Sequence, residues 1–423
     1  MPRILSRHLP EDREGILGPV VLGPAVKLRA VPYPYRAMLA ICSDLDETPD
    51  RAVYWEIMRF LNTTQTTSIG PGVGLEVGNT IYFDMPPEQF AYWNTDDTGR
   101  EMVRALIRSG HIDCLHSYGD LATTRSHAGR ALEELARHDC QLEVWIDHAV
   151  APSNFGADIM KGLGDLPGSE AYHADLTCDY GIKYVWRGRV TSVIGQEVRR
   201  SLRGIANPRH AAGSIQTVAK EALKGALGRC GYSKYALHGP NKVLRRTSLR
   251  DGRPLYEFIR SNPYWGGVDR AATADGLAEA LTPAMLQRLL ARRGVCILYT
   301  HLGKIHRREK PFTRPTLEAL RHLSALYHDG KVLVTTTRRL LGFRRAACEL
   351  AVSARRSGRG LQIDLQTSGD GGVGPLTPGD LDGLTFYASD PDQTRVTIDD
   401  REVEHLQRNP PDETGQPSVS LPR

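Results

Sequence analysis

The stretch AMLAICSDLDET, residues 37–48, is an apolar run that ends in a cluster of polar side chains. A run of six apolar residues is typical of a strand buried on both faces of a parallel sheet. Three carboxylates, Asp44, Asp46 and Glu47, follow where the strand ends. In α/β proteins the catalytic residues gather at the carboxyl ends of the strands, so we expect a site here. An acidic cap on the next helix is the alternative, and these residues alone leave both interpretations open.

Similar apolar runs recur along the chain and alternate with helical patterns. The runs occupy residues 142–146, 182–186, 295–299 and 332–335. Helices are predicted over residues 51–61, 98–109, 126–138, 283–293 and 316–328, several of them after Ser, Thr or Asp caps. This order predicts an α/β domain built as layers or as a barrel.

The character of the sequence changes after Phe343. The chain becomes rich in Gly, Thr and Asp, and period-two patterns predict strands at residues 361–365, 384–388 and 394–398. Residues 409–423 lack apolar periodicity and predict a flexible tail. We therefore expect an N-terminal extension over residues 1–35, an α/β domain over residues 36–343 and a small β-rich domain over residues 344–423.

Composition and targeting signals predict a cytoplasmic protein. The chain has 423 residues, of which 40% are hydrophobic and 24% charged. Its first forty residues contain no apolar segment typical of a signal peptide, and no uninterrupted apolar run of about 18 residues follows. The seven cysteines are scattered without a CxxC pair, which favours reduced thiols over a disulfide framework or a zinc ribbon.

Positive charge is concentrated in a predicted insertion at about residues 197–265. Residues 197–260 carry fourteen Lys and Arg against four acids and include a helical pattern near residues 214–227. The segment lacks interleaved aromatic residues, so a nucleic-acid partner is not expected. Because arginine matches phosphate geometry, we predict that the segment recruits a phosphate-linked sugar or makes weak contact with an anionic membrane. A solvated charged face is the alternative.

Two further motifs carry candidate site residues. GHIDCLHSYGD, residues 110–120, has two imidazoles and two carboxylates, a combination that suits zinc or another first-row divalent metal. Its alternative interpretation is ordinary structural histidines, which we favour for His111. VCILYTHLG, residues 295–303, is a late strand that ends at His301, a candidate general acid or base.

These motifs, in this order, resemble those of the polysaccharide deacetylases with a NodB-homology domain. Residues 44–46 are similar to the first motif of that family, residues 110–120 align without gaps on the second, and residues 298–301 match the last. The resemblance covers roughly residues 36–343. It implies a distorted (β/α) barrel that holds one divalent metal, most commonly zinc.

The resemblance also implies roles for individual residues. Asp44 would be the catalytic base, while Asp46 and His116 would bind the metal. His301 would be the general acid.

The chain departs from the family pattern in two places. Asp120 stands where the family usually has a histidine, and the Arg-Pro-Pro-Tyr-Gly motif is missing. The sequence WIDH, residues 145–148, occupies that strand end, so either Asp120 or His148 would be the third metal ligand. An arginine comes later, and Arg187 would orient Asp44 by a charge-assisted hydrogen bond. A role for Arg187 as a rim arginine paired with another acid is the alternative.

The segment 64–92 is predicted to be a loop over the same edge, with Tyr82 among its residues. A surface hairpin without a ligand is the alternative. The predicted substrate contacts are Asn79, Tyr118, Asp147 and Trp186.

The expected function is metal-dependent hydrolysis of an N-acyl group on an amino sugar or a sugar-containing precursor. A metal-dependent amidohydrolase of a small amide would use the same residues, because a fold does not specify a substrate. A catalytically inactive carbohydrate-binding barrel is the third alternative, motivated by the two departures from the family pattern.

Overall fold

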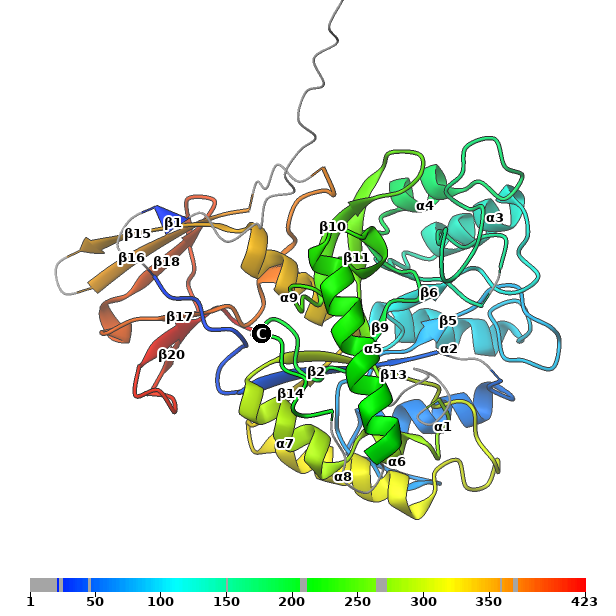
Figure 1. The fold of residues 1–423 in the computed structure, drawn as a ribbon, viewed down its shortest axis with the longest axis horizontal. Helices are drawn as coiled ribbons and strands as arrows, with labels where there is room; N and C mark the ends of the chain where they lie inside the picture. The colour runs from blue at the N-terminus through cyan, green and yellow to red at the C-terminus, as the bar shows by residue number, and fades with distance from the viewer. Residues whose placement is uncertain are drawn as a thin grey trace, which may run out of the picture.

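The computed structural model of the chain describes residues 21–22, 26–44, 47–149, 151–205, 211–263, 272–357, 360–367 and 372–423. These residues form a mixed α/β structure with parallel sheets and helices (Figure 1). The α/β class predicted from the alternating apolar runs and helical patterns is confirmed.

The first sheet contains the strand formed by the opening apolar run. Its strands are parallel and lie in the order β14-β2-β13-β12-β9. Every residue of β2 (Ala37–Ser43) is buried, as a continuous apolar run predicts. The end of β2 is in register with the end of β13, because Ser43 lies opposite Thr300. The other strands are β14 (Val332–Thr335), β13 (Val295–Thr300), β12 (Arg260–Ser261) and β9 (Val190–Thr191).

The second sheet has the order β10-β11-β8-β7-β6-β5. Its strands are parallel except for the antiparallel hairpin of β10 and β11. They are β10 (Leu244–Ser248), β11 (Pro254–Phe258), β8 (Tyr184–Trp186), β7 (Val144–Ile146), β6 (Cys114–His116) and β5 (Thr80–Ile81). Side chains from both sheets, among them Met38, Ile146 and Phe258, share one hydrophobic core.

The two sheets meet along the chain and through a backbone bridge. Strands β8 and β9 are separated by only three residues, and β11 and β12 by one, so each pair passes from the second sheet to the first. Ser43, at the end of β2, forms a parallel bridge with Asn79, which precedes β5. The end of β2 and the start of β5 are therefore neighbours in space.

The basic segment is not an insertion outside the sheets, which corrects the prediction for residues 197–265. Its second half supplies β10, β11 and β12. Leu255 and Phe258 are buried in the core, and Arg245 is neutralised by the buried Glu257 at 2.6 Å. The second half of the segment is therefore part of the sheets although it is basic. The first half contains α5 (Ala211–Arg229), which confirms the helix predicted near residues 214–227, and the short helix η2 (Ser233–Tyr235).

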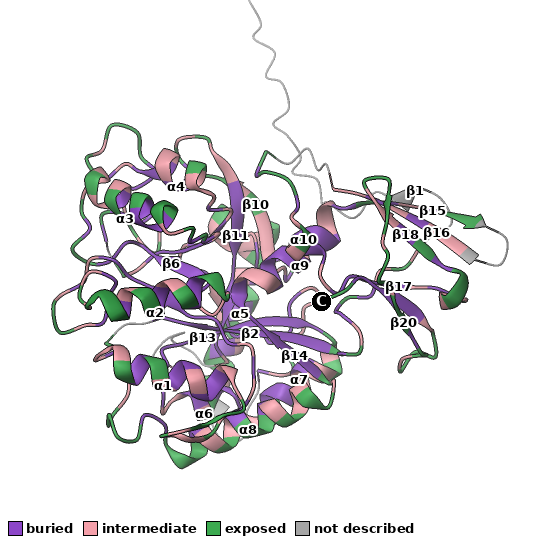
Figure 2. Cartoon of the chain, turned by 180° about the vertical axis from the view of Figure 1, so that it is seen from behind, coloured by how far each residue is buried: buried purple, intermediate pink, exposed green. Residues whose placement is uncertain are grey.

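The five predicted helices are present within two residues of their expected bounds. Asp50 caps the first, because its carboxylate accepts hydrogen bonds from the backbone N–H of Ala52 and Val53 at 2.9 and 3.1 Å. The helices α1 and α2 each carry buried and exposed faces (Figure 2). The helices are α1 (Arg51–Asn62), α2 (Asp97–Arg108), α3 (Arg125–Arg137), α7 (Pro283–Arg292) and α8 (Arg314–His328), with α4 (Ala174–Tyr180) and α6 (Leu277–Ala280) between them. None of the helices that the structure describes is long and apolar enough to span a membrane.

The C-terminal part is β-rich, as predicted, and contains two small sheets. One has the order β1-β15-β16-β18-β19 and the other β17-β21-β20. Their strands are β1 (Val21–Leu22), β15 (Ala351–Ser357), β16 (Gly360–Gln366), β18 (Arg395–Ile398), β19 (Arg401–Glu402), β17 (Thr385–Tyr387), β20 (Gln407–Asn409) and β21 (Ser418–Ser420). The remaining elements are α9 (Thr337–Glu349), α10 (Pro378–Leu381), η3 (Pro391–Gln393), β3 (Thr66–Thr67) and β4 (Gly70–Pro71).

Two boundaries differ from the prediction. Helix α9 runs through Phe343, which is buried, so the change to β structure comes with β15 and not at residue 343. The predicted flexible tail instead begins at the last residue of β20 and contains β21, and the side chains of Val419 and Leu421 are buried. Their burial against the C-terminal sheet holds the tail in place.

The part of the predicted N-terminal extension that the structure describes packs on the C-terminal sheets. Arg29 is buried and donates a hydrogen bond to the carboxylate of Asp412 at 3.0 Å. Leu28 forms a bridge with Phe386 of β17. Residues 1–20 and 23–25 lie outside the described residues.

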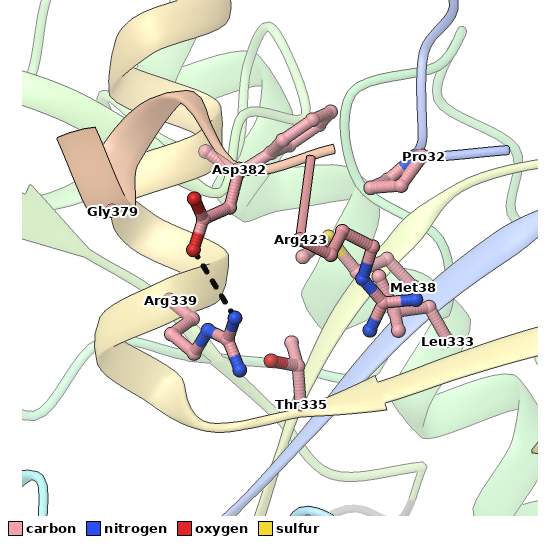
Figure 3. A pocket seen from close by; sticks show the side chains of 9 residues that line it. Pro32, Met38, Leu333, Thr335, Arg339, Gly379, Asp382 and Arg423 are labelled. Atoms are coloured by element: carbon pink, nitrogen blue, oxygen red, sulfur yellow. Dashed lines mark hydrogen bonds and ion pairs between the residues drawn. The ribbon is translucent and has the colours of Figure 1, made fainter. Parts of the chain in front are cut away.

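A small cavity of about 20 Å³ lies where the α/β domain meets the C-terminal part (Figure 3). Met38 and Leu333, from the beginnings of β2 and β14, line it together with Arg423. Arg339 reaches Asp382 across one side at 3.2 Å. The cavity has room for about one water molecule and lies at the opposite end of β2 from Asp44, so it belongs to the domain contact.

We expect the substitution Leu421→Ala to lower the free energy of unfolding by about 2–5 kcal/mol, because it removes a buried side chain from the C-terminal sheet. Urea unfolding followed by tryptophan fluorescence and circular dichroism measures this change. The exposed Arg408→Ala of β20 is the control and should change the free energy by less than about 0.5 kcal/mol. Equal stability of the Leu421→Ala variant and the wild type would mean that the tail is not packed.

Candidate active site

Polar side chains from both sheets gather where parallel strands end. Asp44 follows β2, His116 ends β6 and His148 follows β7. Trp186 ends β8 and His301 follows β13. The carboxyl ends of parallel strands meet at one edge, so these residues converge although they are far apart in the sequence.

The centre of the site is a buried ion pair between Asp44 and Arg260. The guanidinium donates two hydrogen bonds to the carboxylate, at 2.7 and 3.0 Å, and both side chains are almost inaccessible to solvent. The Cζ atom of Arg260 lies 4.1 Å from the ring centroid of Trp186 and 4.8 Å from that of Tyr299. Aromatic faces on a guanidinium favour its positive charge.

This environment keeps Asp44 ionised. Burial alone would raise the pKa of its carboxyl, but the charge of Arg260, and then that of His116, outweighs burial and holds the pKa well below its usual range. Asp44 therefore carries a negative charge throughout the physiological pH range.

Arg260, and not Arg187, is the partner of Asp44, which corrects the sequence-based interpretation. Successive side chains of a strand point to opposite faces, so Trp186 faces Arg260 while Arg187 turns away. Arg187 instead donates to Glu257 at 2.9 Å. The sequence held one signal for Arg260, because it directly follows the apolar residues at the end of β11.

His116 lies next to Asp44. Its Nε2 atom is 3.3 Å from a carboxylate oxygen of Asp44 and 3.4 Å from the hydroxyl of Tyr82. The ring centroids of His116 and Tyr82 are 4.4 Å apart. Tyr82, in the segment predicted to cover the edge, therefore reaches the site.

The chain leaves His116 through a tight turn. Ser117 and Tyr118 have φ angles of 39° and 60°, and Gly119 has 108°. Such values are unfavourable for residues other than glycine and are held here by surrounding contacts. The backbone N–H of Asp84 donates to the carbonyl of Tyr118 at 2.8 Å. A Cβ atom at residue 119 would lie 2.2 Å from the carbonyl oxygen of Asp84, so glycine is required.

Asp120 and His148 are partners, whereas the sequence left them as alternative metal ligands. The Nδ1 atom of His148 lies 2.8 Å from a carboxylate oxygen of Asp120. The side chain of Asn154 accepts a hydrogen bond from the backbone N–H of His148 at 2.9 Å. A carboxylate on Nδ1 orients an imidazole so that Nε2 faces the other way. The ring centroids of His148 and His116 are 4.9 Å apart.

His301 joins the site through Tyr299. Its Nε2 atom lies 3.2 Å from the hydroxyl of Tyr299, whose ring packs on Arg260. The backbone N–H of Leu302 donates to the hydroxyl of Ser43 at 2.9 Å, which holds the end of β13 against the end of β2. His301 is buried.

The donors at this edge match a divalent metal in kind, because they are imidazoles and carboxylates. Among the residues that the structure describes, no three His, Cys, Asp or Glu side chains are placed so that they could hold a metal ion. Asp46, a predicted ligand, lies outside the described residues. The described imidazoles of His116 and His148 thus match a metal site in the kind of donor only.

The other predicted substrate contacts lie differently. The hydroxyl of Tyr118 bonds that of Thr177 at 2.7 Å, and Asn79 accepts a hydrogen bond from its neighbour Thr80. Asp147 is buried and accepts hydrogen bonds from Trp145 and from the backbone of Phe155 at 2.7 and 2.8 Å. Burial raises the pKa of Asp147 to about 7. Tyr118, Asn79 and Asp147 therefore point into the interior of the protein and contact neighbouring residues there. Trp186 instead packs on Arg260.

No family model, curated protein or solved structure matches the chain. The resemblance to the polysaccharide deacetylases thus depends on the motifs of the sequence alone.

Tyr118 belongs to a buried network that should make stability depend on pH. The Nε2 atom of His173 donates to the carbonyl of Ser153 at 2.9 Å, and its Nδ1 atom lies 2.8 Å from the hydroxyl of Thr177. Burial lowers the pKa of His173 to about 4. Because this value is below the unfolded pKa of about 6.5, the stabilisation is complete above pH ~6.5 and is lost as the pH falls towards 4.

We expect the free energy of unfolding to fall by about 2 kcal/mol more in the wild type than in the His173→Gln variant between pH 7 and pH 5, because glutamine does not titrate. Urea unfolding at the two pH values measures this difference. His322→Gln, at an exposed position of α8, should keep the wild-type dependence. The same pH dependence in all three proteins would rule out a buried neutral His173.

We expect Arg260→Met to lower the free energy of unfolding by about 3–5 kcal/mol at pH 7, since the carboxylate of Asp44 stays buried without its main partner. The loss should shrink at pH 4, because protonation of Asp44 then removes the uncompensated charge, whereas wild-type Asp44 stays ionised. Arg187→Met should lower the free energy of unfolding by less, because Glu257 keeps its ion pairs with Arg245 and Arg189. An equal cost for both variants in urea unfolding would contradict a special role for the Asp44 pair.

Proposed function

We propose that the protein is a metal-dependent hydrolase that removes an N-acyl group, such as acetyl, from an amino sugar or sugar-containing precursor. The observation that carries this proposal is the ionised, buried carboxylate of Asp44 beside two imidazoles at one edge of the parallel strands. The resemblance of the motifs to the polysaccharide deacetylases supports the same chemistry. The protein would be a divergent member of that family.

We also propose that the strands form the distorted barrel of that family. The passage of β8 to β9 and of β11 to β12 between the sheets supports this arrangement. The bridge between Ser43 and Asn79 supports it on the other side, because it joins the end of β2 to the start of β5.

One divalent metal, most commonly zinc, would be held by Asp46, His116 and His148. Asp120 would orient His148 through Nδ1 and would not be a ligand itself. This division of roles uses both residues that the sequence left as alternatives. A metal of this kind polarises a carbonyl oxygen and lowers the pKa of bound water from about 15.7 towards about 7.

The residues of the chain would divide the proton transfers between them. Asp44 would accept the proton of the attacking water, and its ionised state suits that role. Arg260 would be a positioning residue, because it holds the carboxylate by two hydrogen bonds. His301 would give a proton to the departing amine, and Tyr299 would orient its ring.

An anionic, phosphate-linked substrate is part of this proposal. The loop that follows His301 is basic and exposed at His306, Arg307 and Lys310. The salt bridge of Lys304 with Glu47, at 3.1 Å, places the loop beside the chain that follows Asp44. Positive side chains on this loop would favour a substrate that carries phosphate.

We expect the purified protein to bind one divalent metal and to release acetate from an N-acetylated amino sugar, faster when the sugar is linked to a nucleotide diphosphate. The double substitution Asp46→Ala with His116→Ala should abolish metal binding, and His148→Ala should weaken it strongly. Asp120→Asn should weaken it by about 10- to 100-fold, as for a residue that orients a ligand. Elemental analysis and metal titration give these values.

Asp44→Asn and His301→Ala should each keep the metal and lose about 10²- to 10⁴-fold in the rate of acetate release. The exposed His322→Ala should keep both metal and rate. A protein with metal but without acetate release from any sugar would indicate an amidohydrolase of another amide. Neither metal nor acetate release would overturn the proposal.

A further inference from the structure

On helix α5 the exposed face is mostly apolar and the buried face carries charge, which is the reverse of a usual surface helix. Ile215 and Leu223 are 71% and 60% exposed, whereas Glu221 is buried. The exposed positions recur at spacings of three and four residues, which places them on one face of the helix. They are Ala212, Gly213, Ile215, Gln216, Ala219, Ala222, Leu223, Ala226 and Arg229, and only Arg229, at the end of the helix, is charged.

Polar contacts attach the inner face of α5 to the first sheet. Glu221 accepts hydrogen bonds from the hydroxyl of Thr191 at 2.9 Å and from the ammonium of Lys224 at 3.0 Å. Lys224 also donates to the backbone carbonyl of Val190, at the start of β9, at 2.8 Å. The helix is thus anchored by its charges and lies on the outside of the sheets (Figure 1). Ordinary amphipathic helices are anchored by their apolar face and expose their charged face.

The basic segment that contains this face exposes mainly positive side chains, because its acids are turned inward. Residues 197–260 contain four acids, and their side chains are between 0% and 7% exposed. These acids are Glu197, Glu221, Asp251 and Glu257. Exposed arginines of the same segment include Arg199, Arg203, Arg229 and Arg246, and the exposed Tyr232 follows α5. The sequence therefore understates the positive charge that this surface presents.

We propose that the outer face of α5 docks on the surface of an anionic membrane. Apolar side chains of a helix lying flat on a bilayer enter the boundary of the acyl chains, while basic side chains beside them meet the anionic head groups. Ile215 and Leu223 would supply the apolar contact, and Arg229, at the end of the same helix, the charge. A second copy of the chain fits this face less well, since it would bring two positive surfaces together.

Docking of this kind is peripheral, weak and sensitive to salt. The apolar contact is limited to two large side chains, so binding needs the basic residues, whose attraction to head groups is screened within about 10 Å at 0.1 M salt. The inference does not depend on the proposed hydrolase chemistry, because no residue of the candidate active site takes part in it.

The test is sedimentation of the full chain with vesicles of phosphatidylcholine, with and without phosphatidylglycerol, at low and high salt. We expect binding only to vesicles that contain phosphatidylglycerol, and its loss at high salt. The double substitution Ile215→Ser with Leu223→Ser should reduce the partition coefficient by roughly tenfold or more, as two apolar side chains no longer enter the bilayer. Arg229→Ala should reduce it by about fivefold.

The control is Ile159→Ser with Leu166→Ser, which removes two exposed apolar side chains outside the basic segment and should leave binding unchanged. Circular dichroism and the melting temperature verify that each variant is folded. Binding equal in the α5 variant and the wild type would overturn the proposal, as would no binding to anionic vesicles at low salt. Self-association of the wild type in analytical ultracentrifugation that the α5 substitutions abolish would assign the face to a second copy and equally overturn it. Acetate release from a soluble substrate is measured in parallel, so that failure of membrane docking is distinguished from failure of the proposed function.

Discussion

The buried pair of Asp44 and Arg260 is the interaction on which the arrangement of the strands around the candidate site depends. The two residues are separated by 216 positions in the chain, yet both are almost fully excluded from water. A buried charge without a partner is strongly destabilising, so the end of β2 and the start of β12 must stay together. Trp186 from β8 and Tyr299 from β13 enclose the guanidinium and extend the same constraint to two more strands.

The imidazoles of the site are held by a second set of constraints around this pair. His116 is placed by a strand end and by a left-handed turn that hydrogen bonds to its backbone carbonyls stabilise. His148 is oriented by the carboxylate of Asp120 and the amide side chain of Asn154. Tyr82 packs near both rings, with centroid separations of 4.4 Å to His116 and 5.3 Å to His148. Side chains held in this way lose little conformational entropy on binding a ligand, which favours a preorganised site.

Elsewhere too, carboxylates buried within the protein decide where arginine and lysine side chains point. Glu257 contacts Arg187, Arg189 and Arg245, and Glu221 anchors α5 through Lys224 and Thr191. The segment that is most basic in the sequence thus places its acids and several of its cations inside. Its outer surface consists of the remaining arginines and the apolar face of α5. The burial of the ion pairs therefore also explains why apolar residues are exposed.

The sequence by itself determined the parts of the structure that depend on local patterns. Apolar runs and capped helical periodicities predicted β2, β13 and five of the helices within two residues, because burial and capping act between near neighbours. The meeting of Asp44, His116 and His301 at one edge followed from the shared direction of parallel strands. Only the tertiary structure decided that Arg260 and not Arg187 pairs with Asp44, that Asp120 supports His148, and that residues 409–423 complete a sheet. Each of these outcomes depends on which face of a strand a side chain takes and on which distant segment supplies its partner, and neither is encoded in the spacing of neighbouring residues.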